Sequence, residues 1–393
     1  MNTRKFLFLI ISLCIISVVQ SQTPTTPPGT IVSHRPKDTG IYIGSPGLCI
    51  LPDGSYLASH DEFGPKTSEF RSAKTFIFHS KDKGNTWQKI AKIDGQFWSN
   101  LFVHNGAVYI MGTHKHHGNF IVRRSDDGGH TWTIPYDSQN GLILEGEYHT
   151  APMPVVIHKG RIWRAVEYAT APWTEWGKRY SALMVSAPVN ADLLQAKNWR
   201  RTNHLMYDST YLEGHFNAWL EGNAVVSPHG EMLDILRVDA SIKGEEYAAI
   251  VKISKNGKKA TFDPQSGFIK FPGGSKKFAI RYDEITKRYW TLTNYVKPEF
   301  KQRTPSSIRN TLVLCSSTDL KEWTLHKVLL DHPDTKKHGF QYVEWLFEGN
   351  DIIFLSRTAY DEKSGQANNN HDANFLTFHR IKDFRDLASV RIE

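Results

Sequence analysis

Histidine, arginine and tyrosine side chains recur at the ends of short apolar segments, where loops of a β-rich fold would meet. The positions concerned are His60, Asp61, His114, Tyr148, His149, Arg164, His215, Glu221, Arg237, Arg281, Arg309, Arg357 and His371. Arginine binds carboxylate and sulfate groups through paired N–H donors, and imidazole and phenol groups can transfer protons. Together these residue types predict a site for an anionic ligand, such as a carboxylated or sulfated sugar.

Each of these residues also has a purely structural interpretation. His114 begins a run, residues 114–117 (HKHH), that can be a solvated loop. Consecutive histidines lack the spacing of structural zinc sites, so no metal is predicted. Tyr148 can anchor a turn through its hydroxyl, and Arg164 and Arg281 can pair with carboxylates between sheets. Only the convergence of several such side chains on one surface favours a functional site.

A short motif that occurs twice indicates the scaffold that would position these residues. Residues 80–87 and 125–132 both read S-x-D-x-G-x-T-W, 45 residues apart. This is the Asp-box of sialidase-like β-propellers, and the spacing fits one four-stranded blade. Its Ser and Asp side chains bond backbone N–H groups of a tight turn, its glycine supplies a positive φ, and its Trp packs between sheets. The motif predicts a ring of blades and no catalytic group.

Short alternating strands, bounded by turn residues, run from residue 43 to the C-terminus and predict an all-β fold, a single β-propeller. Inner hairpins are expected at residues 51–55, 103–107, 157–161, 228–231, 283–286 and 347–351, which gives six blades by direct count. The last copy, residues 374–381, lacks a following strand, and residues 30–33 are expected to complete its sheet. Inner strands of such a ring run in one direction, so the loops that enter them meet on one face.

The N-terminus and the charge predict where the protein acts. Residues 1–21 resemble a secretory signal, because Arg4 and Lys5 precede an apolar run that ends in small and polar residues. The mature chain, residues 22–393, is therefore expected to be a secreted or periplasmic propeller with no membrane span. A formal net charge of +8 favours a polyanionic partner, and no Lys/Arg block suggests nucleic acid. Whether Cys49 and Cys315 form a disulfide is left open.

Four segments carry a resemblance to a known group of enzymes. They are residues 148–154 (YHTAPMP), 160–164 (GRIWR), 219–223 (WLEGN) and 371–380 (HDANFLTFHR). With the Asp-boxes, they look like the propeller uronate lyases: ulvan lyases, rhamnose-glucuronate lyases, and related oligosaccharide dehydratases and rhamnosidases. The resemblance implies seven blades and an anionic, uronate-containing glycan as substrate, with no cofactor. We expect a monomer.

The resemblance also implies a mechanism and roles for individual residues. Elimination across C4 and C5 of a uronate next to rhamnose needs a neutralised carboxylate, a base for the C5 proton and an acid for the leaving oxygen. Tyr148 would be the base or acid, His114 its partner, and Arg164 would hold the carboxylate, with Arg281 or Arg309 as further candidates. His60, His149, His215 and Arg237 complete the predicted substrate-binding set. Chain-cleaving lyase and non-reducing-end dehydratase remain alternatives.

Two other classes stay open. The first is glycoside hydrolysis, with Asp61 and Glu221 as paired carboxylates or with the single histidine attributed to the rhamnosidase branch. The second is a propeller that binds glycans without catalysis. Sialidases share the scaffold but need an arginine entering the first inner strand, where this chain has residues 42–46 (YIGSP). That difference argues against sialic acid chemistry.

Overall fold

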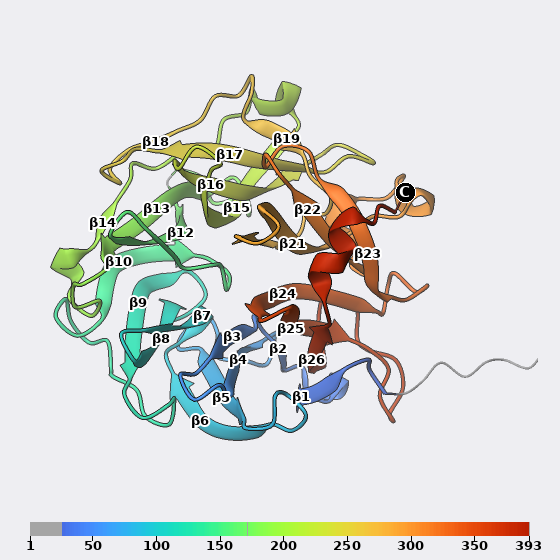
Figure 1. The fold of residues 1–393 in the computed structure, drawn as a ribbon, viewed down its shortest axis with the longest axis horizontal. Helices are drawn as coiled ribbons and strands as arrows, with labels where there is room; N and C mark the ends of the chain where they lie inside the picture. Colours follow the sequence, from blue (N-terminus) through green and yellow to red (C-terminus); the bar gives the residue numbers. More distant parts are fainter. Residues whose placement is uncertain (1–25, 171, 393) are drawn as a thin grey trace, which may run out of the picture.

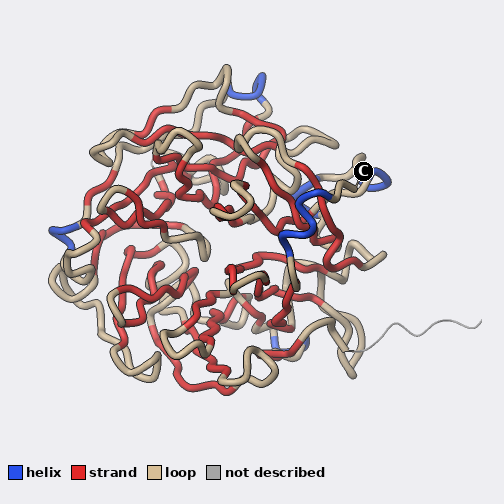
Figure 2. Tube along the Cα trace, in the orientation of Figure 1, coloured by secondary structure: helices blue, strands red, loops and turns tan. Residues whose placement is uncertain are grey.

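The computed structural model describes residues 26–170 and 172–392, so the predicted signal at residues 1–21 lies outside the described part. The described chain is almost entirely β-structure, with short 3-10 turns between strands (Figure 2). None of the helices formed by these residues is long and apolar enough to cross a membrane. The 3-10 turns are η1 Lys37–Thr39, η2 Ala196–Asn198, η3 Tyr211–Gly214, η4 Pro298–Phe300, η5 Pro305–Ser307 and η6 Phe384–Ser389.

The strands follow one another around a central axis, as the colours of Figure 1 show. The first sheets comprise β2 Tyr42–Ile43, β3 Gly47–Ile50, β4 Tyr56–Phe63, β5 Lys74–Ser80 and β6 Gln88–Asp94, then β7 Phe97–His104, β8 Ala107–Thr113, β9 Gly118–Ser125, β10 Leu142–His149, β11 Val156–His158, β12 Arg161–Ala169, β13 Tyr180–Pro188 and β14 Arg200–Arg201. Strand β10 pairs with both β9 and β12 and so merges two sets of strands into one eight-stranded sheet. The sheets therefore do not give the number of blades, which stays a prediction.

The second half of the chain continues the ring and returns to its start. It comprises β15 Phe216–Val226, β16 Met232–Ala240, β17 Tyr247–Ile253, β18 Ala260–Thr261 and β19 Phe268–Lys270, then β20 Ala279–Asp283, β21 Arg288–Asn294, β22 Thr311–Ser317 and β23 Thr324–Asp331, and last β24 Gly339–Glu348, β25 Asp351–Ala359 and β26 Phe375–Ile381. β1 Thr30–His34 pairs antiparallel with β26, as predicted for residues 30–33. The all-β propeller prediction is confirmed.

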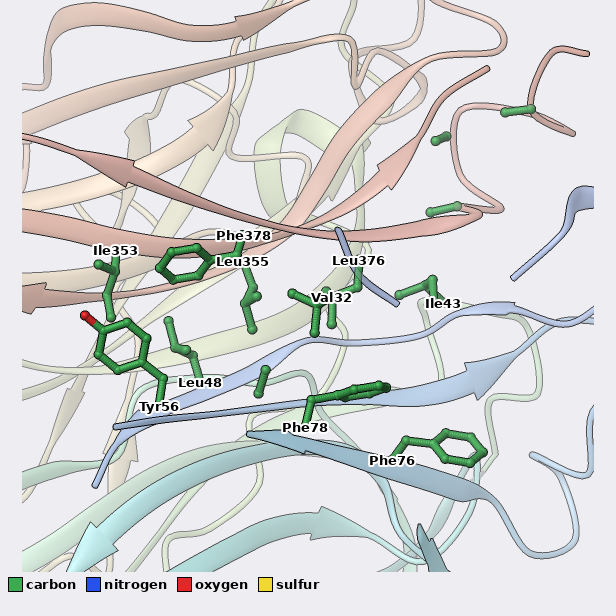
Figure 3. Packing of buried hydrophobic residues seen from close by; sticks show 14 residues of the cluster. Val32, Ile43, Leu48, Tyr56, Phe76, Phe78, Ile353, Leu355, Leu376 and Phe378 are labelled. Atoms are coloured by element: carbon green, nitrogen blue, oxygen red, sulfur yellow. The ribbon is translucent and has the colours of Figure 1, made fainter. Parts of the chain in front are cut away.

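The last sheet packs face to face with the first. Figure 3 shows Leu355, Leu376 and Phe378 of β25 and β26 meeting Leu48, Tyr56 and Phe78 of β3, β4 and β5. All six side chains are buried. Burial of apolar surface contributes about 25 cal/mol per Å², so this contact joins the two ends of the chain through the hydrophobic effect.

The six predicted hairpins are all present and join β3–β4, β7–β8, β11–β12, β15–β16, β20–β21 and β24–β25. Asn105 and Gly106 in the β7–β8 turn both have positive φ (48° and 80°), as a two-residue type I′ turn requires. Each of these hairpins leaves an innermost strand at the same end of the ring. The other ends of the innermost strands, where each strand begins, therefore lie together on one face of the ring.

The Asp-boxes close their turns as the motif predicts. Ser125 Oγ accepts the amide of Gly129 (2.8 Å), and both carboxylate oxygens of Asp127 bind Thr131. Trp132 Nε1 donates to the carbonyl of Gly129, and its ring packs between neighbouring sheets. Residues 80–87 repeat the same bonds. These side chains are used within their own turns, which confirms their scaffold role.

Candidate active site

Three innermost strands carry a β-bulge where they enter the ring. The register shifts between Phe97 and Asn100 in β7, between Leu220 and Gly222 in β15, and between Gln341 and Glu344 in β24. A bulge turns a side chain away from the alternation of a regular strand. The re-aimed residues are Trp98, Glu221 and Tyr342, and Trp98 and Tyr342 have the left-handed φ values of 45° and 51°. The other non-glycine residues with positive φ in the described chain lie outside strands, so Trp98 and Tyr342 differ from them by holding this conformation within a strand. Strain of this kind marks a candidate functional position.

Tyr342, Glu221 and Arg237 form one hydrogen-bonded group. The Tyr342 hydroxyl donates to Glu221 Oε1 at 3.2 Å, and Arg237 Nη1 donates to both oxygens of Glu221 at 3.0 and 2.9 Å. Glu221 and Arg237 are buried, whereas Tyr342 is only half-buried. Ser275 holds Arg237 from the other side through its backbone carbonyl. The arrangement presents a phenol, backed by a carboxylate, towards the face.

Two further arginines on this face have neutral partners. Arg309 Nη1 donates to Gln341 Oε1 (2.7 Å), and Arg357 Nη2 donates to the backbone carbonyl of His371 (2.7 Å). The Arg357 guanidinium also lies 5.2 Å from the centre of the Tyr342 ring. Among the ion pairs of the described residues, neither Arg309 nor Arg357 is matched by a carboxylate. Buried positive charge without a counter-ion favours binding of an anion.

Burial dominates the pKa values of these two arginines. Burial is the main cause that lowers the pKa of Arg309 to about 10; Arg237 and Arg357 act in the same direction, whereas Tyr342 and Glu221 oppose the shift. Burial likewise lowers the pKa of Arg357. An anionic ligand would stabilise both charged guanidinium groups through a favourable Coulomb interaction in a low-dielectric site. We call Arg237, Arg309, Arg357, Tyr342 and Glu221 the cationic half of the site.

The facing side of the site is built from histidine and aromatic rings. His149 Nδ1 lies 3.2 Å from Glu167 Oε2, and the other oxygen of Glu167 accepts the Gly222 amide at 3.0 Å. Glu167 thus connects His149 to the bulge that carries Glu221. The His149 ring stacks on Tyr180 and meets the edge of Trp98, both at 4.4 Å. Burial lowers the pKa of His149 and raises that of Glu167, so the pair stays uncharged and shares one proton.

Asp61 supports the histidine and aromatic side of the site through the β7 bulge. Its carboxylate accepts the Trp98 amide (2.8 Å) and the Thr75 hydroxyl (2.8 Å), and it is fully buried. Burial raises its pKa to about 7. The carboxylate therefore holds the β7 bulge in place.

The structure brings together some of the predicted site residues. His149, Arg237 and Arg309 lie in the site, with Glu221, Arg357 and His371 from the wider set of positions. His371 stands beside Asp372 and contacts the ring of Phe63, which in turn lies under Arg357. Their convergence follows from the shared direction of the innermost strands.

Tyr148 and Arg164, the predicted catalytic pair, are not brought together. Tyr148 is opposite Tyr168 in the β10–β12 pairing, and Arg164 lies four positions before Tyr168 in β12, about 13 Å from it at strand spacing. The Tyr148 hydroxyl accepts from Arg201 Nη1 (3.2 Å), and its ring is buried in the core. Arg164 is fully buried and donates to the carbonyls of Ala151 and Ala165. These contacts fit the structural interpretation of both residues.

Four other predicted residues lie outside the cluster. His60 is buried between Ser33 and the backbone of Asp61. His114 accepts the amide of Asn119 within its own turn, and His215 is exposed before β15. Arg281 pairs with Glu344 and the carbonyl of Trp345.

Arg281 also borders a cavity of about 620 Å³ near the distal ends of the innermost strands. This cavity is lined by Val225, Val226 and Phe347, which come later in β15 and β24 than Glu221 and Tyr342. It therefore lies at the opposite end of the axis from the candidate active site. No group of three or more His, Cys, Asp or Glu side chains within the described residues could hold a metal ion.

The sequence alone did not identify Trp98, Tyr180 and Tyr342 as site residues. Each is an aromatic residue at the start of a strand, which is also the composition of an ordinary core. For Tyr342, its place in the sequence could have indicated a site residue. Residues 339–344 enter an innermost strand, and Gln341, Tyr342 and Glu344 stand there among apolar neighbours. A regular alternation would have placed Tyr342 differently, and the bulge cannot be read from the residue types.

Comparisons with known proteins support the fold. No family model matches the chain. A sialidase of Clostridium perfringens is 28% identical over 118 residues, which are 30% of this chain and 31% of the relative's length. The chain thus matches under one third of that relative.

Among solved structures, similar folds belong to enzymes that act on sugars. An α-L-arabinanase of Penicillium chrysogenum aligns with a TM-score of 0.55 at 15% identity, covering 93% of this chain and 100% of its own. An α-L-arabinofuranosidase of Fusarium graminearum gives 0.57 at 12%, covering 93% and 99%. A Trypanosoma rangeli sialidase gives 0.52 at 13%, covering 93% and 60%. These likenesses define a sialidase-like propeller fold. The finer resemblance to uronate lyases stays a prediction.

Proposed function

We propose that this protein is a glycoside hydrolase that cleaves a glycan next to a carboxylated sugar. One observation carries the proposal: the Tyr342–Glu221 hydrogen bond lies among buried arginines, two of which have no carboxylate partner among residues 26–170 and 172–392. The carboxylate of the sugar would bind Arg309 and Arg357. This replaces the predicted Tyr148–Arg164 site with one in the cationic half.

The phenol suits an acidic substrate. A carboxylate nucleophile would be repelled by the carboxylate of the sugar, whereas a neutral phenol is not, and tyrosine nucleophiles are a known exception to the paired-carboxylate rule. Glu221 would take the proton of Tyr342 as its oxygen attacks the anomeric carbon. Water would then displace the tyrosyl group, with Glu221 returning the proton to Tyr342.

The departing sugar needs a proton, and His149 with Glu167 can supply it. With the shared proton on Glu167, the other ring nitrogen of His149 carries a hydrogen. His149 would donate this hydrogen to the leaving oxygen while Nδ1 receives the proton of Glu167, which leaves Glu167 as a carboxylate. In the second step the attacking water would give one proton back to the pair, which restores its starting state. The connection of Glu167 to the Gly222 amide supports this role, because it holds the pair next to Glu221.

The named relatives support hydrolysis, since they are called sialidases, arabinanases and arabinofuranosidases. The residues entering the first innermost strand are Gly44, Ser45 and Pro46, without the arginine that sialidases use. We therefore favour a uronic acid over sialic acid.

Elimination at a uronate is the second candidate. Tyr342 beside several guanidinium groups also fits a base for the C5 proton, with the carboxylate neutralised by Arg309 and Arg357. The two reactions give different products. Hydrolysis adds the elements of water, whereas elimination leaves an unsaturated uronate that absorbs ultraviolet light.

The test is mass spectrometry of products formed in ¹⁸O-water. The substrates are a glucuronate–rhamnose tetrasaccharide, sialyllactose and a neutral arabinotetraose. We expect cleavage of the uronate substrate with one ¹⁸O incorporated, lost in Tyr342→Phe and Glu221→Gln. Tyr282→Phe is the matched control, because Tyr282 borders the cavity at the opposite end. Unlabelled, unsaturated product would establish elimination instead, and full activity of Tyr342→Phe would exclude both mechanisms.

A further inference from the structure

Five rings form a continuous arc beside His149 and Trp98. Phe70 stacks on His116 at 4.4 Å, and His116 meets the edge of His117 at 4.5 Å. His117 Nε2 lies 2.6 Å from the Tyr180 hydroxyl, and the Trp176 ring stands perpendicular to Tyr180 at 6.4 Å. We call Phe70, His116, His117, Tyr180 and Trp176 the aromatic arc.

The ends of the arc are unusually exposed for large apolar side chains. Phe70 is 63% exposed and Trp176 is 57% exposed. They come from the β4–β5 and β12–β13 loops, and the β8–β9 turn lies between them with His116 and His117. Polar ring edges alternate with these apolar faces. Exposed aromatic surface framed by polar groups is typical of a ligand-binding groove.

The arc is continuous with the catalytic groups. Tyr180 stacks on His149, and His116 contacts Trp98 at 4.3 Å. Burial raises the pKa of Tyr180; Arg179 opposes this, whereas Glu221, Glu167 and Tyr342 add to it, so charges of both halves of the site act on this phenol. A ligand held at the arginines would therefore extend directly onto the arc.

We propose that the aromatic arc binds the sugar units that follow the anionic sugar in the same glycan chain. The inference rests on the proposed function for the position of the anionic sugar in the cationic half. A pyranose offers an apolar C–H face that stacks on an aromatic ring, and hydroxyl groups at its rim that bind imidazole and phenol groups. The exposed rings of Phe70 and Trp176 match the apolar face. The part-exposed imidazoles of His116 and His117 match the hydroxyl rim, whereas the buried Tyr180 holds His117 in place. The substrate is accordingly an oligosaccharide or polysaccharide, and a single anionic sugar uses only half of the site.

The experiment compares ligands of two lengths by calorimetry. The protein carries Tyr342→Phe to prevent turnover, and the probes are free glucuronic acid and a glucuronate–rhamnose tetrasaccharide. We expect the tetrasaccharide to bind at least about tenfold more tightly. Adding Trp176→Ala should weaken tetrasaccharide binding by about tenfold and leave glucuronic acid binding unchanged, and Phe70→Ala should act in the same direction. Trp176→Phe should restore part of the lost tetrasaccharide affinity.

The matched control is Tyr136→Ala, because Tyr136 is 69% exposed but lies in the β9–β10 connection outside the arc. It should leave both affinities unchanged. Equal affinity for the two probes, or an unchanged length gain in Trp176→Ala and Phe70→Ala, overturns the inference. The proposed function is judged separately by product formation in the wild-type protein. If Trp176→Ala abolishes the tighter binding of the tetrasaccharide but the wild-type protein forms no product, the aromatic arc is a binding site and the proposed reaction is excluded.

Discussion

The hydroxyl of Tyr342 donates a 3.2 Å hydrogen bond to Glu221, a residue 121 positions away in the chain. Each residue lies in a bulge of an innermost strand, Tyr342 in β24 and Glu221 in β15. A shift of one position moves a side chain to the other face of a strand, so the bulges decide that the two groups meet. Gly222 permits the β15 bulge, because a side chain there would collide with Asp234 and Ala165.

The same substitution, Tyr to Phe, distinguishes the two candidate catalytic tyrosines, Tyr342 and Tyr148. Tyr342→Phe should lower kcat by about 10²-fold or more, because it removes the reacting oxygen next to Glu221. Tyr148→Phe should leave kcat within about threefold, since its hydroxyl accepts a hydrogen bond from the Arg201 side chain, away from Glu221 and Tyr342. Steady-state kinetics and thermal unfolding of both variants are the measurements. The reverse order of effects would return the catalytic role to Tyr148.

Substrate affinity should depend on the unpaired arginines and on salt. Arg357→Ala should raise KM for the uronate substrate by about tenfold or more, because a charge-assisted hydrogen bond is lost. KM of the wild-type protein should also rise with ionic strength, less steeply than for exposed charges because the site is partly buried. Arg200→Ala, at an exposed position in β14, is the control. A KM unaffected by Arg357→Ala would contradict binding of the carboxylate there.

Acid should destabilise the fold through buried histidines. Burial lowers the pKa of His60 to about 3 from 6.5, so the unfolded chain binds a proton that the folded protein does not. The free energy of unfolding is unaffected by this group above pH 6.5 and falls as the pH drops from 6.5 towards 3. His60→Gln should make this slope shallower by about 1.4 kcal/mol per pH unit. Chemical denaturation at several pH values measures it, and identical slopes would refute the assignment.

The Asp-boxes should affect stability and not turnover. Ser125→Ala removes the acceptor of the Gly129 amide and should cost about 1–2 kcal/mol of unfolding free energy. Because Ser125 lies in an outer turn, kcat should remain unchanged. Thermal denaturation and kinetics of the variant test this, and lost activity in a protein of normal stability would point to a functional role for the motif.

Local features of this protein were accessible from its sequence. The Asp-boxes and the Asn105-Gly106 turn are formed by neighbouring residues, whose side chains and φ preferences act over a few positions. The repetition of such features predicted the propeller and the pairing of residues 30–33 with the last sheet. It also predicted that arginines such as Arg237 and Arg309 would meet on one face, because the innermost strands share a direction.

The partners of each charged residue were decided by the tertiary structure. Arg237 and Arg309 have the same residue type and similar burial, yet only Arg237 is matched by a carboxylate, that of Glu221. Tyr148 and Tyr342 both lie in strands, but a bulge turns only Tyr342 towards Glu221. Residue types determine which chemistry is available. Register shifts and packing between distant strands, which depend on the whole ring, determine which side chains face one another.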